Sequence, residues 1–320
     1  MFDVITVGSA TVDVFVDTSN RLLKEEDCCL SIPFGAKILV DGIHFDTGGG
    51  GTNTACALAK LGLKTAMIGK VGDDHNSEMI LRHLKGFGCD TSLLVRGNGP
   101  SDYSVILDAS GRDRTILTSK QMNDQLYPDD LDLSKIRTRW FYFCTMLGDS
   151  LKTQATLLDY ALENGVSVIY NPSSYIINRK PEGFLRIVSS VQILILNKEE
   201  AMLLAGIDKM VETAKKILSM GPSVVVITDG ASGAYAFSKE AGYQILPNEV
   251  KVVENTGAGD SFGAAFLVGY LSTGDLKIGL EFGATEAESV IQHLGAKNRL
   301  LSREEVENKI RENPHQIVTI

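Results

Sequence analysis

Short apolar runs rich in valine and isoleucine alternate along this chain with longer stretches of helical periodicity. Six apolar runs predict buried strands, at residues 4–8, 65–69, 140–144, 166–170, 192–196 and 223–228. Four stretches between or after them predict helices, at residues 52–61, 151–163, 197–204 and 257–271. This alternation is typical of a mostly parallel sheet with helices on both faces. We therefore expect an α/β fold with a Rossmann-like three-layer αβα core.

Two stretches break this rhythm, residues 14–46 and residues 93–118. Their polar and apolar positions alternate, as in half-exposed antiparallel strands, and turn residues punctuate them at Pro33, Gly35, Gly42 and Gly111. We expect these insertions to form a small β-sheet that lies as a lid over one edge of the core. The core would then comprise residues 1–13, 47–92 and 119–320.

One face of such a lid would cover the core, and the other face would be free to contact a second copy of the chain. The apolar candidates for this free face are Val14, Val16, Ile38 and Val40. The pattern therefore predicts a homodimer formed through the lid.

The composition narrows the class of protein. Of 320 residues, 44% are hydrophobic and 22% are charged, which is ordinary for a globular protein. A formal net charge of −9 has the wrong sign for binding a phosphate backbone, so it argues against a nucleic-acid partner. Five cysteines without C-x-x-C spacing indicate neither a disulfide framework nor a zinc site. The N-terminus lacks a signal-peptide pattern and the apolar runs are too short to span a bilayer, so we expect a cytoplasmic protein with no membrane partner.

The segment from Glu254 to Phe262 carries the clearest chemistry. Small residues at Gly257, Ala258 and Gly259 let the backbone approach a ligand, and the first N–H groups of a helix form an anion hole for a phosphoryl group. Asp260 stands in the first helical turn, where it could accept the proton of an attacking hydroxyl. The alternative is a helix cap that serves stability alone.

A second glycine-rich segment, residues 46–55, also opens a helix. Its four consecutive glycines, residues 48–51, would weaken any regular element, which indicates a tight path or a close approach to a ligand. A dinucleotide fingerprint would have to follow the first strand directly, and this run does not. A flexible hinge between lid and core remains an alternative.

Four motifs together resemble those of the ribokinase family of sugar and nucleoside kinases, also called the PfkB family. They are G-G-x-G-x-N-x-A near residue 50, N-T-G-A-G-D near residue 258, an early G-S-A-T-V-D and an N-K-E-E after a central strand. The resemblance covers nearly the whole chain. It implies a ribokinase-like fold and the ATP-dependent transfer of a γ-phosphoryl group to a hydroxyl of a sugar-type acceptor.

The resemblance also implies roles for individual residues. Asp260 would be the general base, and the anion hole would consist of the backbone amides of Gly257, Ala258 and Gly259. Acceptor hydroxyls would be held by Asp13, Gly48, Gly49 and Asn53. The nucleotide loop would contain Thr228, Gly230 and Gly233, and Asn197 and Glu200 would match an N-x-x-E motif that organises Mg²⁺ through water. Two of these assignments have structural alternatives, because Asp13 could simply end a strand and Asn197 with Glu200 could form a capping box.

Departures from the family pattern bear on the acceptor. Members that phosphorylate ribose have Asn, Lys and Glu at the places of Thr11, Gly50 and Thr145, so ribose is not the expected acceptor. We read Asn255 as replacing an aspartate of the D-T-x-G-A-G-D motif, which predicts weak dependence on K⁺.

The acceptor class stays open. Arg112 and Arg114 in the lid could contact an anionic acceptor such as a phosphosugar or a keto-sugar acid, or could be solvated turn charges. The sugar-acid kinases of the family tend to carry an additional Arg after the strand that ends near residue 170, where this chain has Asn171-Pro172-Ser173, which argues against a keto-sugar acid. A nucleoside is also possible, because Phe15, Phe34 and Phe45 could stack on a base. A different class of function, a sugar-sensing binding protein without turnover, would have no need of the base Asp260.

Overall fold

The computed structural model describes residues 1–17, 24–26, 29–31, 34–108 and 115–320. In this part of the chain the larger sheet has ten strands in the order β16-β15-β14-β13-β12-β11-β10-β1-β6-β7. Its parallel strands are β1 (Phe2–Val7), β6 (Thr65–Val71), β7 (Leu94–Arg96), β10 (Thr138–Cys144), β11 (Ser167–Asn171), β12 (Ile193–Asn197) and β13 (Val224–Thr228). Antiparallel strands extend one edge: β14 (Ala234–Phe237), β15 (Gly242–Ile245) and β16 (Ile317–Thr319). The predicted α/β class is confirmed.

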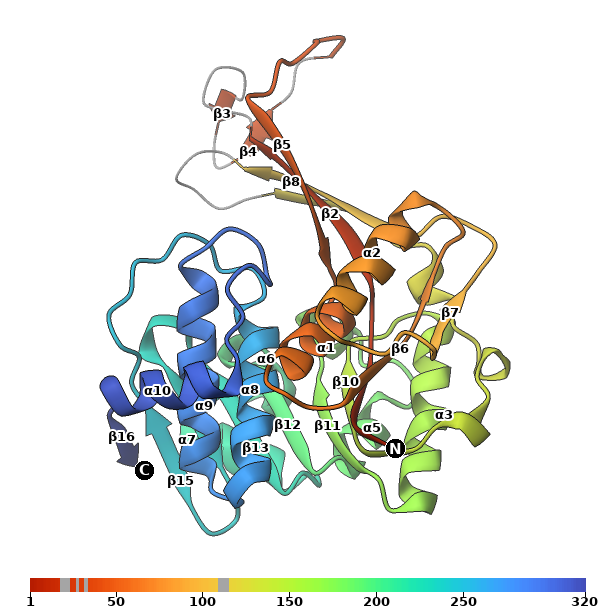
Figure 1. Ribbon diagram of the computed structural model, residues 1–320. Coiled ribbons are helices and arrows are strands. Elements are labelled where there is room, and N and C mark those ends of the chain that lie inside the picture. Colours follow the sequence, from red (N-terminus) through yellow and green to blue (C-terminus); the bar gives the residue numbers. More distant parts are fainter. Residues whose placement is uncertain (18–23, 27–28, 32–33, 109–114) are drawn as a thin grey trace.

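Helices cover both faces of this sheet (Figure 1). One face is covered by α1 (Gly50–Lys60), α2 (His75–Gly86), α8 (Ala258–Thr273), α9 (Leu276–Ile291) and α10 (Arg303–Glu312). The other is covered by α3 (Asp149–Asn164), α4 (Ser174–Arg179), α5 (Phe184–Ser190), α6 (Lys198–Ala205) and α7 (Met210–Leu218). Short 3₁₀ turns occur at Met122–Asp124, Pro128–Asp130, Leu133–Lys135 and Gly230–Ser232. The three-layer arrangement therefore matches the prediction.

Two hydrophobic clusters, one on each face of the sheet, explain why the central strands are apolar throughout. In β1, Val4 belongs to the cluster under α1 and α8, whereas Ile5 and Val7 belong to the cluster under α3 and α5. All three side chains are fully buried. Burial of each such side chain contributes about 1.5–3 kcal/mol. A strand that is buried on both faces has no polar face, so its sequence is apolar throughout instead of alternating between polar and apolar residues.

A smaller sheet of four strands stands out from the body of the molecule (Figure 1). Its order is β5-β2-β8-β9, and its strands are β2 (Thr11–Asp17), β5 (Gly42–Gly48), β8 (Asp102–Asp108) and β9 (Thr115–Ser119). The pairs β2–β5 and β8–β9 are antiparallel, as expected for hairpin-like insertions, but the central pair β2–β8 is parallel. A two-stranded ladder joins β3 (Lys24–Glu26) and β4 (Cys29–Ser31).

The division into core and lid remains a prediction, and the strands differ from its bounds; β5 and β9 of the small sheet, for example, run on to Gly48 and Ser119. The small sheet begins at Thr11 rather than at residue 14, and Leu94–Arg96 pairs with β6 in the large sheet although residues 93–118 were assigned to the lid. The predicted turn positions Pro33 and Gly111 lie outside the described residues. Among the described residues, no helix is long and apolar enough to cross a membrane.

Candidate active site

The carboxyl ends of the parallel strands open into two adjoining cavities. The first has a volume of about 750 Å³ and the second of about 1140 Å³. Asn197 at the end of β12, Thr228 at the end of β13 and Gly259 at the start of α8 line both cavities. Ligands of α/β proteins bind at this edge of the sheet, so the two cavities form one candidate site with two compartments that meet at these residues.

Asp260 lies in the first turn of α8 and lines the first cavity. Its Oδ2 accepts a hydrogen bond of 2.8 Å from the side-chain amide of Asn53 in α1. Burial raises the pKa of Asp260 to about 6, although the Asn53 hydrogen bond and the charge of Lys297 act in the opposite direction. A carboxylate with this pKa is mostly ionised at pH 7 and can still accept a proton effectively, as a general base must.

The start of α8 does not depend on Asp260 for a cap. The helix begins after Gly257, which has φ of 77° and no side chain to act as a cap. A Cβ on Gly257 would lie 2.4 Å from Cβ of Ala296, whereas a Cβ on Gly259 would meet nothing within 4 Å. The amide of Ala258, predicted as part of the anion hole, donates to the carbonyl of Asn255 at 3.3 Å and is therefore left out of the anion hole proposed below. A glycine is therefore required at position 257 by the backbone conformation and by the close packing against Ala296. Gly259, in contrast, lines both cavities and leaves its backbone uncovered there.

The glycine run that opens α1 is explained largely by contacts within the protein. A Cβ on Gly48 would lie 1.8 Å from Oδ2 of Asp13, and one on Gly51 would lie 2.7 Å from the carbonyl carbon of Gly8. Gly49 has φ of 92°, a conformation that favours glycine. Gly50 alone of the four lines the first cavity. The run thus lets the chain after β1 and the start of α1 pass close together beneath the site.

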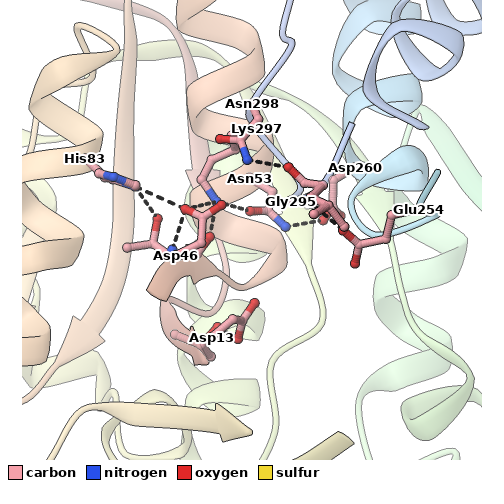
Figure 2. Close-up of polar contacts among 12 residues, drawn as sticks. Asp13, Asp46, Asn53, His83, Glu254, Asp260, Gly295, Lys297 and Asn298 are labelled. Atoms are coloured by element: carbon pink, nitrogen blue, oxygen red, sulfur yellow. Dashed lines mark hydrogen bonds and ion pairs between the residues drawn. The ribbon is translucent and has the colours of Figure 1, made fainter. Parts of the chain in front are cut away.

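Asp13 is half-buried in β2, next to Gly48. Its Oδ1 accepts a hydrogen bond from the Thr11 hydroxyl at 3.1 Å, and burial raises its pKa against the opposing charge of Lys297. Figure 2 shows Asp13 set apart from the group that contains Asp260 and Asn53. The predicted acceptor residues Asp13, Gly48, Gly49 and Asn53 lie beside the first cavity and are not part of its lining.

Asn197 and Glu200 form the capping box of α6 and also line the first cavity. Asn197 Oδ1 accepts from the Glu200 amide at 2.8 Å, and Glu200 Oε2 accepts from the Asn197 amide at 2.9 Å. Glu200 Oε1 accepts from the Ser174 hydroxyl at 3.0 Å, and burial raises the pKa of Glu200. The capping function is therefore real, and it leaves both side chains at the cavity wall.

The predicted nucleotide loop follows β13. Thr228, Gly230 and Gly233 line the second cavity. Gly230 and Gly233 have φ of 51° and 89°, and a Cβ on Gly233 would lie 1.9 Å from the carbonyl oxygen of Ile245. Apolar side chains from other elements complete this cavity, among them Val250, Val252, Phe262 and Ile291. The second compartment thus combines a glycine turn with apolar walls.

Sequence reasoning did not identify Lys297, which lies after α9 at the centre of the polar contacts drawn in Figure 2. It is 3% exposed, and its Nζ donates to the carbonyl of Thr47 and to Oδ1 of Asn53 at 3.0 Å. It belongs to none of the recognised motifs, and its partners lie about 250 positions earlier in the chain. Only the fold brings these residues together.

The interpretation of Asn255 needs correction. The loop before α8 retains a carboxylate one position earlier, at Glu254. Glu254 Oε2 accepts a hydrogen bond of 2.7 Å from the amide of Gly295, and Thr256 donates to its Oε1. The expected loss of a carboxylate from this loop is therefore wrong, and the argument for weak K⁺ dependence no longer holds. Arg112 and Arg114 lie outside the described residues.

Comparisons with known proteins agree with this geometry. The family model of the pfkB family carbohydrate kinases matches residues 1–303. A 5-dehydro-2-deoxygluconokinase of Clostridium perfringens is 30% identical over 308 residues, which cover 91% of this chain and 87% of that protein. The structure of Arabidopsis thaliana ribokinase complexed with ribose and ATP superimposes with a TM-score of 0.79 at 25% identity, covering 96% of this chain and 98% of the other. A nucleoside kinase of Methanocaldococcus jannaschii has the same fold, with a TM-score of 0.81 at 20% identity over 98% of this chain and 99% of its own. The chain belongs to the pfkB family of carbohydrate kinases, enzymes that transfer a phosphoryl group to an alcohol group of their substrate.

Proposed function

We propose that this kinase transfers the γ-phosphoryl group of ATP to a hydroxyl of a sugar-type acceptor, with Asp260 as the general base. The acceptor hydroxyl gives its proton to the Asp260 carboxylate while its oxygen forms a bond to the γ-phosphorus. The bond from the γ-phosphorus to the bridging oxygen breaks, and ADP leaves. The observation that carries the proposal is a half-buried carboxylate with a pKa of about 6 beside the junction of two cavities.

The two compartments suggest where each substrate binds. The second cavity has apolar walls for a base and a glycine turn at residues 230–233 for close backbone approach, so we assign it to ATP. The first cavity contains Asp260, so we assign it to the acceptor. The amides of Gly257 and Gly259 at the start of α8 would then offset charge on the transferred group at the junction.

Magnesium fits this site as an ion that the nucleotide brings, not one that a protein cage holds. Among the described residues there is no group of three His, Cys, Asp or Glu side chains able to hold a metal ion. Mg²⁺ typically keeps several waters and uses one or two carboxylates together with substrate phosphates. Glu200, at the wall of the first cavity, is the carboxylate we assign to bind it through water. Bound Mg²⁺ would offset the negative charge of the phosphates.

The lining of the first cavity favours a polyhydroxylated acceptor. Its polar side chains are mostly hydroxyls and amides, including Thr118, Asn123, Thr145, Asn171 and Ser173. Lys120 is the only cation among the described residues that line it, and Asp102 lies 3.6 Å from its ammonium group. Such groups suit the hydroxyls of a sugar or a sugar acid. The named activity of the Clostridium perfringens relative makes 5-dehydro-2-deoxygluconate the first acceptor to test.

A nucleoside acceptor receives less support from the lid than the sequence suggested. Side chains alternate between the faces of a strand, so Phe15 shares the face of Asp13, and Phe45 lies on the opposite face with Val14. Phe34 is fully exposed. Of the three phenylalanines considered for base stacking, Phe15 is therefore the one on the face of the predicted acceptor residues.

A coupled ADP-release assay with ATP and Mg²⁺ tests this function. The acceptor panel would contain 5-dehydro-2-deoxygluconate, ribose, fructose 6-phosphate and adenosine. We expect acceptor-dependent ADP release with at least one of the first three. Release with adenosine alone would favour a nucleoside kinase. No release with any acceptor, together with calorimetric binding of a sugar, would favour the non-catalytic sugar-binding protein.

We also propose that the outer face of the lid joins two copies of the chain. Ile43, Phe45 and Leu117 share this face and are 57%, 54% and 57% exposed. Of the residues first suggested, Val14 is only 4% exposed and so offers little area to a partner. Light scattering at micromolar concentration should give twice the chain mass, and F45D should give a monomer. A monomeric wild-type protein would contradict the proposal.

A further inference from the structure

Lys297 is a buried cation whose hydrogen bonds are all to other residues of the protein. Its side chain is 2% exposed, and Asp46, at 3.8 Å, is 5% exposed. The ammonium group donates to the Thr47 carbonyl and to Asn53 Oδ1, and the Asp46 carboxylate lies on a third side (Figure 2). Thr47 and Asn53 thus accept two of the three donors of the ammonium group, and Asp46 forms an ion pair with it.

These contacts determine how the Asn53 amide is oriented. Because an ammonium group can only donate, the Asn53 atom that faces Lys297 at 3.0 Å must be the oxygen. The amide nitrogen then points the other way and donates to Oδ2 of Asp260 at 2.8 Å. A flipped amide would set its nitrogen against the ammonium group and its oxygen against the carboxylate, and both contacts would be repulsive.

The orientation of the Asn53 amide gives the two carboxylate oxygens of Asp260 different surroundings. Oδ2 is occupied by Asn53, whereas Oδ1 lies on the side of Gly50, where an added Cβ would come within 3.6 Å of it. Gly50 and Asp260 both line the first cavity. Oδ1 is therefore the oxygen available to accept a proton from a ligand in that cavity.

Lys297 is also the cation in a cluster of acidic groups from several elements. Asp46 of β5 lies 3.8 Å from its ammonium group, and the charge of Lys297 also acts on Asp13 of β2 and Asp260 of α8. His83 of α2 lies 3.5 Å from Asp46 and 2.9 Å from the Thr47 hydroxyl. Burial raises the pKa of Asp13 and of Asp260, and the charge of Lys297 opposes this effect at both. Without the lysine, desolvation would push these carboxyl groups further toward their neutral forms.

We propose that Lys297 is a positioning residue, which fixes the Asn53 amide so that Asp260 is held ionised with one oxygen free to act as the base. This inference rests on the proposed function only for the role of Asp260 as a base. The coupling between Lys297 and the ionisation of Asp260 can be measured without any acceptor.

The direct test is a carbon NMR titration of protein labelled with ¹³C at the aspartate carboxyl carbons. D260N assigns the Asp260 signal, and the wild-type signal should titrate near pH 6. In K297M the midpoint should rise by about one pH unit or more, because a nearby opposite charge is lost. K297R should stay close to wild type, and K309M, which removes an exposed lysine from α10, should not change the midpoint. An unchanged midpoint in K297M would overturn the proposal, whether or not the protein is a kinase.

K297M leaves Asp46 buried without its cation, which can impair folding. The double variant D46N/K297M removes both charges of this pair and keeps the titration measurable. Its Asp260 midpoint should also lie above that of wild type, since the charge that opposes burial is gone. A midpoint at or below the wild-type value would contradict the proposal.

Kinetics with the acceptor found in the panel separate positioning from substrate binding. In K297M we expect kcat at pH 7 to fall on the order of tenfold to a hundredfold, as for a misplaced catalytic group, with the acceptor KM within about threefold of wild type. Raising the pH should restore only part of the loss, because ionising Asp260 does not reorient Asn53. A raised KM with unchanged kcat would instead make Lys297 a substrate-binding residue and overturn the proposal.

Discussion

The side-chain amide of Asn53 lies 2.8 Å from Oδ2 of Asp260 and joins two helix starts that are 207 positions apart in the sequence. Both helices begin in glycine-rich segments, and both pack on the same face of the large sheet. The two recognised motifs are therefore parts of one hydrogen-bonded unit. Asn53, which we expect to hold the acceptor, also contacts the proposed base.

Loss of the Asn53 amide should impair the base more than acceptor binding. N53A removes the donor that lowers the pKa of Asp260, so the acidic limb of kcat/KM should move to higher pH and kcat should fall on the order of tenfold or more. N164A, which removes an exposed amide at the end of α3, is the matched control and should behave as wild type. Pre-steady-state and pH-rate measurements would check this. A change in KM alone would assign Asn53 to acceptor binding.

The pH dependence of the wild-type enzyme follows from the ionisation of Asp260. A general base acts in its deprotonated form, and burial raises the pKa of this carboxyl group to about 6. Below pH 6 the activity should therefore fall about tenfold per pH unit, and it should reach a plateau above pH 7. An acidic limb centred near pH 4 would mean that the carboxylate is not desolvated in the working enzyme.

Two neighbouring glycines of α8 should respond differently to alanine. G257A places a Cβ 2.4 Å from Ala296 at φ of 77°, so it should destabilise the fold by about 1–3 kcal/mol. G259A meets no atom within 4 Å and should leave stability within about 1 kcal/mol of wild type. It should nevertheless reduce phosphoryl transfer, because Gly259 lines both cavities at the place where we propose that its amide faces the transferred group. Thermal unfolding and activity measurements of the two variants check these expectations. Full activity of G259A would argue against a phosphoryl group bound at the Gly259 amide.

A buried histidine should make stability depend on pH away from the site. His315 Nδ1 and Nε2 lie 2.9 Å from Glu281 and from Glu288. Burial lowers its pKa, but these two carboxylates more than offset this effect and raise the pKa to about 9. Its contribution is therefore complete below about pH 6.5 and is lost as the pH rises toward 9. H315Q should lower the free energy of unfolding by about 2 kcal/mol at pH 6 and by much less at pH 9.5. The exposed His75 provides the control H75Q, which should change stability little at either pH.

The central strands and the four helices α1, α3, α6 and α8 could be predicted because their signals are local. The helices α2, α7, α9 and α10 and the antiparallel strands β14, β15 and β16 were not predicted. Strands buried on both faces are continuous apolar runs, and α3 and α6 end at glycines in the left-handed region, Gly165 and Gly206. The three-residue strand β7 and the parallel pairing of β2 with β8 were missed, because a short edge strand has little pattern and pairing between distant segments leaves none.

The same distinction applies to the site. Asp260 and the glycines of α8 could be found because they lie together in one segment, whose residue types indicate an anion hole and a general base. Lys297 could not, since its significance comes from Thr47 and Asn53, which only the fold brings to it. Most of the first glycine run proved to serve close packing with residues 8–13. A glycine needed for a ligand and one needed for another backbone look alike in a sequence.

The most direct test of the account is D260N measured for transfer and for binding in the same preparation. Asparagine keeps the size of the side chain but cannot accept the proton. We therefore expect phosphoryl transfer to the panel acceptor to fall about a thousandfold. Calorimetry should give an acceptor affinity within about threefold of wild type, since the cavity lining is otherwise unchanged. Transfer by D260N at more than a tenth of the wild-type rate, with binding intact, would contradict the assignment of Asp260 as the general base.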